Sequence, residues 1–179
     1  MASAAQLCEQ GMQARREHRA EDARRDFTEA LAVARELGDA VAQARSLSGL
    51  AQIERDLREL GLARKHYEEA AALYRESGNT RRLAHAVRHV ADVCRELHDL
   101  VAAQRGYAEA LTLYRADEKT APLDFANALR GYALLREEVG DRTAAIEMWG
   151  EARAIYASLG IQAGVEESER RLKALGQRG

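Results

Sequence analysis

Three side chains in one predicted helix have the types and spacing of a metal site. His85, His89 and Asp92 follow one another at steps of four and three residues, so they share one face of a helix. Two imidazoles and a carboxylate can bind zinc or iron. The sequence offers no second cluster to complete such a site, and a solvated helix face gives the same pattern. We therefore predict no metal and no cofactor.

The two cysteines, Cys8 and Cys94, are the next candidates for chemistry. They lie far apart in the sequence, and neither belongs to a Cys-x-x-Cys pair. Redox sensing is one interpretation, but a helical cysteine is more often a small buried hydrophobic residue. We expect two reduced thiols in a cytoplasmic protein.

Catalytic motifs are missing from the sequence. It contains no glycine-rich dinucleotide or phosphate loop, no His-Glu-x-x-His and no Gly-x-Ser-x-Gly. A nucleophile beside a base, or a set of convergent carboxylates, is not indicated either. We predict that the protein is not an enzyme and keep catalysis as the second alternative.

The elements that would position these residues form a repeat. The aromatic residues Phe27, Tyr67, Tyr107 and Trp149 belong to four similar stretches and advance by 40, 40 and 42 residues. A nearly constant spacing of this size is the sequence signature of a solenoid. Within each unit, apolar residues recur at steps of three and four in two successive runs, which predicts two helices per unit.

The repeat divides the chain, which we expect to form one domain over residues 1–179. After the last unit, residues 162–179 place Val165, Leu172 and Leu175 on one side of a helix and charged residues elsewhere. That pattern is typical of a capping helix, which a repeat array needs at its end. The predicted units are residues 3–39, 40–79, 80–119 and 120–161.

The second unit resembles the tetratricopeptide repeat. Small residues flank an aromatic one at Ala63, Tyr67 and Ala70, and the third unit repeats this order 40 residues later. The resemblance covers about residues 3–161, although units of 40 to 42 residues are longer than the usual 34 or so and are similar to a 40-residue subclass of the family. It implies an all-α fold, a right-handed α-α superhelix (a TPR-like solenoid) of four helical hairpins plus a C-terminal capping helix.

The resemblance also implies that the first helix of each unit lines a concave groove. On these helices, beside the core positions, sixteen residues form what we call the arginine stripe, with six arginines and two acids. The chain has 27 basic and 29 acidic residues in 179, so about 2.4 and 2.6 would be expected in sixteen positions. The candidate ligand-binding residues in the stripe are Arg15, Arg45, Gln52, Arg55, His85, Arg88, Asp92, Arg95, Asn127, Arg130 and Leu134. Its other members are Ala5, Cys8, Met12, Ser48 and Glu137.

Two interpretations of the arginine stripe remain open from the sequence. Guanidinium groups bind carboxylates and phosphates through paired hydrogen bonds, which would make the stripe an anion-attracting groove. It could equally be a solvated face that neighbouring acids balance. The first interpretation favours a non-catalytic scaffold that binds a protein or peptide partner, possibly acidic. The first alternative is a peptide-sensing regulatory domain of a bacterial signalling or transcription system.

The bulk properties limit the other partners. A formal net charge of −2 gives no general reason to bind nucleic acid or an acidic membrane. No stretch approaches the roughly 18 apolar residues of a membrane span, and the first twenty residues do not resemble a signal peptide. Apolar residues outside the core pattern, such as Leu62 and Leu134, form no second stripe, so we expect a monomer or weak dimer.

Overall fold

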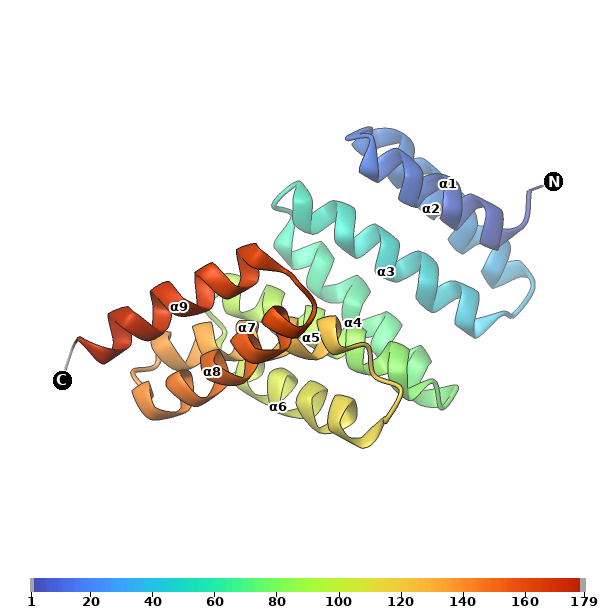
Figure 1. Cartoon of the computed structure of the whole chain (residues 1–179). Helices are drawn as coiled ribbons and strands as arrows, with labels where there is room; N and C mark the ends of the chain where they lie inside the picture. The colour runs from blue at the N-terminus through green and yellow to red at the C-terminus, as the bar shows by residue number, and fades with distance from the viewer. Residues whose placement is uncertain (1, 178–179) are drawn as a thin grey trace.

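The computed structural model describes residues 2–177, and this part of the chain consists of nine helices without a strand. Successive helices pack side by side in a curved array, with the N-terminus at one end and α9 at the other (Figure 1). The expected all-α superhelix is confirmed, while residues 178 and 179 of the predicted cap lie outside the described range. No helix within residues 2–177 is long and apolar enough to cross a membrane. The helices are α1 (Ala4–Arg16), α2 (Ala20–Glu36), α3 (Ala40–Asp56), α4 (Leu60–Glu76), α5 (Thr80–Glu96), α6 (Leu100–Ala116), α7 (Pro122–Glu138), α8 (Arg142–Ser158) and α9 (Gln162–Gly176).

Local signals set the ends of these helices. The side chain of Asp39 accepts a hydrogen bond from the backbone N–H of Ala42 and so caps α3. Gly38 and Gly78 follow α2 and α4 with positive φ angles of 65° and 67°, which glycine adopts without a steric penalty. The link before α7 has no such glycine, and α7 instead begins with Pro122, whose missing N–H costs nothing there.

The repeated aromatic residues lie at the centre of the core. Phe27, Tyr67, Tyr107 and Trp149 are each at most 1% exposed. Ala63, which packs with Tyr67, is completely buried, so the paired helices approach closely there. Truncating one of these buried rings to alanine would cost on the order of 3–5 kcal/mol.

At two junctions between units, an aromatic ring of one unit packs against a glycine of the next. A Cβ atom at Gly49 of α3 would lie 2.3 Å from Cε1 of Phe27, and one at Gly131 of α7 would lie 2.7 Å from Cε1 of Tyr107. No real Cβ tolerates such contacts, so the ring of one unit packs directly on the backbone of the next. Accordingly, α1 packs on α3 and α5 packs on α7.

The junction between α3 and α5 differs, because a histidine takes the place of the glycine. His89 lies 40 residues after Gly49, and its ring stacks on Tyr67 with centroids 4.9 Å apart and planes 6° from parallel. The extra ring occupies the space in which the two backbones would otherwise meet. The helices α3 and α5 consequently do not pack backbone to backbone along their length.

The helix α9 covers the end of the array. It packs on α8, and Gly164 admits the ring of Tyr156, since a Cβ there would lie 2.5 Å from the Cγ of that ring. Leu175 is 8% exposed and joins the apolar cluster around Trp149. The helix therefore occupies the place of the first helix of a further unit.

Candidate functional site: a pocket between the third and fifth helices

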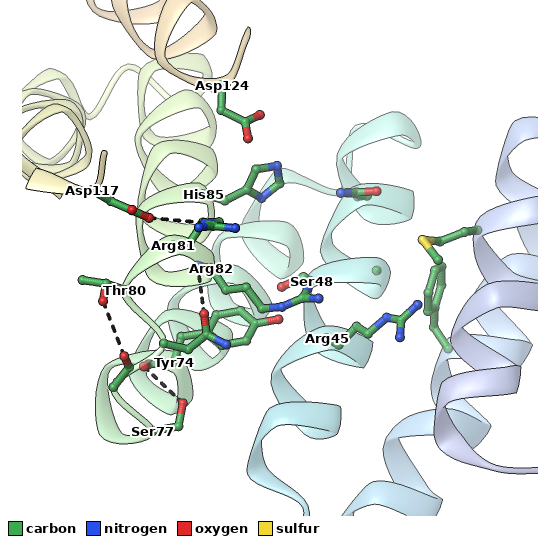
Figure 2. A pocket seen from close by; sticks show the side chains of 16 residues that line it. Arg45, Ser48, Tyr74, Ser77, Thr80, Arg81, Arg82, His85, Asp117 and Asp124 are labelled. Atoms are coloured by element: carbon green, nitrogen blue, oxygen red, sulfur yellow. Dashed lines mark hydrogen bonds and ion pairs between the residues drawn. The ribbon is translucent and has the colours of Figure 1, made fainter. Parts of the chain in front are cut away.

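A pocket of about 890 Å³ opens between the N-terminal halves of α3 and α5 (Figure 2). All four of the helices that begin the units contribute to it: α1, α3, α5 and α7. These are the helices that the resemblance assigns to a concave groove. The pocket is lined by Met12, Phe27, Arg45, Ser48, Gly49, Gln52, Tyr74, Ser77, Gly78, Asn79, Thr80, Arg81, Arg82, His85, Asp117 and Asp124.

The shape of the pocket follows from how α3 and α5 are joined. Near their C-terminal ends, Arg55 of α3 donates from Nε to Glu96 of α5 over 2.9 Å and from Nη1 to Asp92 over 3.4 Å. Further towards the N-terminal ends, the stacked ring of His89 separates the two helices. The two helices are thus joined near their C-terminal ends and separated at His89. This arrangement leaves an open space between their N-terminal halves.

Most of the arginine stripe is already paired. Five of its six arginines form ion pairs with carboxylates of this chain, mostly in the following unit. This pairing removes the reason to expect an anion-attracting groove along the whole stripe. The pairs are Arg15 with Asp56 at 2.7 Å, Arg55 with Glu96 at 2.5 Å, Arg88 with Asp92 at 2.8 Å, Arg95 with Glu138 at 2.6 Å and Arg130 with Glu167 at 2.6 Å.

The sixth arginine of the stripe, Arg45, lies in the pocket with its charge unpaired. Within residues 2–177 its side chain forms no hydrogen bond or ion pair, and the same holds for Arg82 of α5. The side chain of Arg82 extends across the pocket towards Ser48 of α3 (Figure 2). Arg81, by contrast, points to the rim and donates to Asp117 over 3.2 Å. The pocket therefore holds two free guanidinium groups.

Two of the three residues with the spacing of a metal site, His89 and Asp92, are committed to other contacts. Nε2 of His89 lies 2.7 Å from Arg88, which can only donate, so the imidazole accepts this hydrogen bond. Asp92 accepts from the Tyr107 hydroxyl over 2.7 Å and from Arg88 over 2.8 Å. Their lone pairs are used within the protein, and Asp92 acts as a buried link between α5 and α6.

His85 lies in the pocket as a neutral side chain. Burial and the nearby charge of Arg88 lower its pKa from 6.5 to about 4. Its ring contacts the ring of His89 edge to face, with centroids 4.5 Å apart. Burial and Arg88 also lower the pKa of His89 well below its usual value. Neither imidazole carries a positive charge near pH 7.

The remaining stripe residues are divided between the pocket and other sites. Gln52 lines the pocket and also accepts a hydrogen bond from Arg15 over 3.2 Å. Asn127 accepts from the hydroxyl of Tyr156 over 2.8 Å, while Leu134 packs beside Trp149. Of the eleven predicted residues, the structure thus brings Arg45, Gln52 and His85 together in the pocket.

A second, smaller cavity continues from the first along α3. It has a volume of about 150 Å³ and shares Gln52 with the larger pocket. The hydroxyl of Tyr67 and Nδ1 of His89, both of which belong to residues that line it, are buried without a hydrogen-bond partner in the described structure. Spaces of this kind commonly hold ordered water.

Among the lining residues that the sequence analysis missed, two carry a charge that is unpaired within residues 2–177: Arg82 and Asp124. Arg82 and Asp124 each lie three residues before a member of the stripe, namely His85 and Asn127. Extending the stripe by one helical turn towards the N-terminus would have included both. The periodicity of the helices did not indicate at which end the pocket would lie.

Comparison with known proteins identifies the fold. The tetratricopeptide repeat family matches residues 2–76, whereas no curated protein matches the chain. Similar solved structures include BtubC (BKLC) from P. vanneervenii, with a TM-score of 0.79 and 20% identity over 88% of this chain and 64% of that chain. A Rap protein complexed with Competence and Sporulation Factor has a TM-score of 0.78 and 17% identity over 96% and 48%.

A third similar structure, the MamA protein, has a TM-score of 0.63 and 14% identity over 98% of this chain and 92% of that chain. The chain thus spans about two thirds of BtubC and about half of the Rap protein. At these identities the similarity concerns the fold alone. Residues 2–76 thus match the tetratricopeptide repeat family, and the helical array over the described residues 2–177 has the fold of these similar structures.

Proposed function

We propose that the protein is a non-catalytic interaction scaffold that binds an acidic protein or peptide segment in the pocket between α3 and α5. The observation that carries this proposal is a pocket of about 890 Å³ with two unpaired guanidinium groups, those of Arg45 and Arg82. A volume of this size lies within the range of specific ligand sites. The tetratricopeptide fold supports an interaction role for the chain.

The chemistry of the walls defines what the pocket would accept. Arginine holds a carboxylate through two parallel hydrogen bonds, and Arg45 and Arg82 come from facing helices. Exposed charge pairs contribute only about 0–1 kcal/mol each, so apolar contacts with the partly exposed Met12 must add to the affinity. A dissociation constant in the micromolar range is the natural expectation for such a site.

A peptide-sensing regulatory domain is the second candidate. The observation that favours it is the likeness to the Rap protein, whose structure was solved in complex with Competence and Sporulation Factor. The present chain spans 48% of that protein. With this second candidate we also propose that the protein is a member of the 40-residue repeat subclass.

We further propose a cytoplasmic location and a monomeric or weakly dimeric state, with no nucleic-acid or membrane partner. Both cysteines are buried free thiols, as a reducing compartment would maintain. Cys8 lies 3.4 Å from the hydroxyl of Ser46, inside the array. Light scattering at micromolar concentration would test the oligomeric state.

The proposed function can be tested with defined peptides. Acidic, neutral and basic peptides of equal length would be titrated against the wild type and an Arg45→Glu, Arg82→Glu double variant by fluorescence polarisation. We expect the wild type to prefer acidic peptides and to bind them more weakly as salt increases, because exposed charges are screened within about one Debye length. The double variant should lose this preference.

A matched control uses Lys65 of α4, an exposed residue outside the pocket. Lys65→Glu reverses one charge in the same protein and should leave the preference for acidic peptides intact. Equal binding of acidic peptides by the wild type and the double variant would contradict the proposed function.

A further inference from the structure

The pocket contains a third unpaired charge, and it is negative. Asp124, in the first turn of α7, lines the pocket and forms no side-chain hydrogen bond or ion pair within residues 2–177. Its carboxylate points towards His85, while Arg45 and Arg82 lie further along the pocket, beside α3 (Figure 2). The three unpaired charges are therefore separated by sign within one cavity, with Asp124 at one end and the two arginines at the other.

From this arrangement we propose that the pocket recognises a dipolar segment of peptide. Its acidic group would contact Arg45 and Arg82, and its cationic group would contact Asp124. The proposal rests on the proposed function and refines it, because opposite charges at the two ends of the pocket would fix the direction in which a segment binds. It also assigns Asp124 as a specificity-determining residue.

Within residues 2–177, no basic side chain forms an ion pair or a hydrogen bond with the carboxylate of Asp124. In the view of the pocket the carboxylate points towards His85, which is neutral near pH 7 because its pKa lies at about 4 (Figure 2). Arg81 is engaged with Asp117, which also accepts from the backbone N–H of Lys119 over 2.9 Å. A half-buried carboxylate without a partner is costly unless water or a ligand satisfies it.

Asp117 provides the contrast within the same pocket. It too lines the cavity, but its charge is balanced by Arg81 and its side chain also organises the link before α7. Asp124 has neither of these uses. The two acids therefore separate into one with a structural role and one that remains free for a cationic group.

The cationic group could be a lysine or arginine side chain or a free amino terminus. These share a positive charge and N–H donors, and they differ in whether acetylation of the peptide removes them. A library made in two forms, with free and with acetylated amino termini, distinguishes the sources. Enrichment of lysine or arginine in both forms indicates a side chain, and loss of binding on acetylation indicates the terminus.

The test is a selection of random heptapeptides on beads with the full-length protein. We expect wild-type selections to contain both an acidic residue and a cationic group. Asp124→Asn should lose the cationic requirement, keep the acidic one and bind the selected peptides about fivefold more weakly. Asp124→Glu should restore binding, and Asp124→Lys should favour peptides with two acids.

A matched control is Glu118→Gln, which removes an exposed acid from the link before α7 without altering the pocket lining. It should select the same peptides as the wild type. Melting temperatures of all variants show whether they are folded. If the wild type selects acidic peptides without a cationic group, and Asp124→Asn selects the same ones, the dipolar proposal is overturned while the proposed function stands. If the wild type selects no peptides, both fail.

Discussion

The junction between α1 and α3 and the junction between α3 and α5 have the same repeat architecture and different outcomes. In the first, Gly49 lets the ring of Phe27 pack on the backbone of the next unit, and the helices close together. In the second, His89 stands in the glycine position, stacks on Tyr67 and keeps the helices apart. The residue at this position of each unit, glycine or histidine, thus distinguishes the closed junction from the open one.

Ion pairs join the first helices at both junctions, and the open junction adds a buried network centred on Asp92. Asp92 receives hydrogen bonds from Arg55 of α3, Arg88 of α5 and Tyr107 of α6. At the corresponding place in the first junction, Gln52 accepts a hydrogen bond from Arg15 and from no other side chain of the described residues. The open junction therefore contains a buried carboxylate network that the first junction lacks among residues 2–177.

The largest expected effect is on this network. Asp92→Ala should lower the free energy of unfolding by about 3–5 kcal/mol, because it leaves the buried guanidinium of Arg88 without its carboxylate. Asp56→Ala, which breaks the exposed pair with Arg15, should cost less than about 1 kcal/mol. Urea denaturation measures both, and equal losses would show that the open junction has no special dependence on its network.

The closed junction should respond to the loss of its glycine. Gly49→Ala should destabilise the protein by about 1–3 kcal/mol, because the new methyl group would lie 2.3 Å from the ring of Phe27. Gly150→Ala is the matched control, since nothing lies within 4 Å of a Cβ there and alanine favours a helix by about 1 kcal/mol. Thermal unfolding should move in opposite directions for the two variants; a stable Gly49→Ala protein would contradict close packing.

The two buried imidazoles make the open junction sensitive to acid. His85 has a pKa of about 4 in the folded protein and 6.5 as its ordinary value, so between these values the unfolded chain binds more protons. Stability should therefore fall as the pH is lowered from about 6.5 towards 4. Carboxylates such as Glu167, whose pKa is lowered mainly by Arg130, contribute in the same direction.

A variant separates the histidine contribution from that of the carboxylates. His85→Asn removes one of the depressed imidazoles and should flatten the dependence of the melting temperature on pH between 6.5 and 4. His18 is a suitable control, because it is exposed at the turn after α1. A His85→Asn protein with an unchanged pH profile would mean that the imidazole is not buried in the neutral form.

The smallest effects are expected on the second helices of the units, where all junctions are alike. Arginines there pair with the recurring glutamates of the following unit, as in Arg75 with Glu109 at 2.7 Å. A double-mutant cycle on this pair should give a coupling of about 0.2–1 kcal/mol, because Arg75 is 55% exposed. The pair Arg35 with Glu69 should give the same value, and a clear difference would show that open and closed junctions also differ here.

The fold could be predicted from the sequence because it depends on local and periodic sequence signals. The spacing of Phe27, Tyr67, Tyr107 and Trp149 indicated the repeat, and steps of three and four residues indicated the helices. Each hairpin depends on residues close in sequence. The superhelix then follows because a single hairpin cannot cover its own apolar face.

The candidate site could be predicted only in part, because it depends on how neighbouring units are placed. Arg45 and His85 were identified from their position on the first helices. The pairing of Arg55 with Glu96 joins residues 41 positions apart, and the periodicity of a single helix does not reveal it. The replacement of glycine by His89 was visible in the alignment of the units, but its effect depends on the ring of Tyr67 from another helix.

The central claim is that the ring of His89 holds α3 and α5 apart and so creates the pocket. Spin labels at two exposed positions, Val41 of α3 and Arg81 of α5, report their separation by pulsed electron paramagnetic resonance. We predict that His89→Gly shortens this distance and abolishes peptide binding, because the backbones can then meet as they do at Gly49. An unchanged distance with peptide binding intact would contradict the claim.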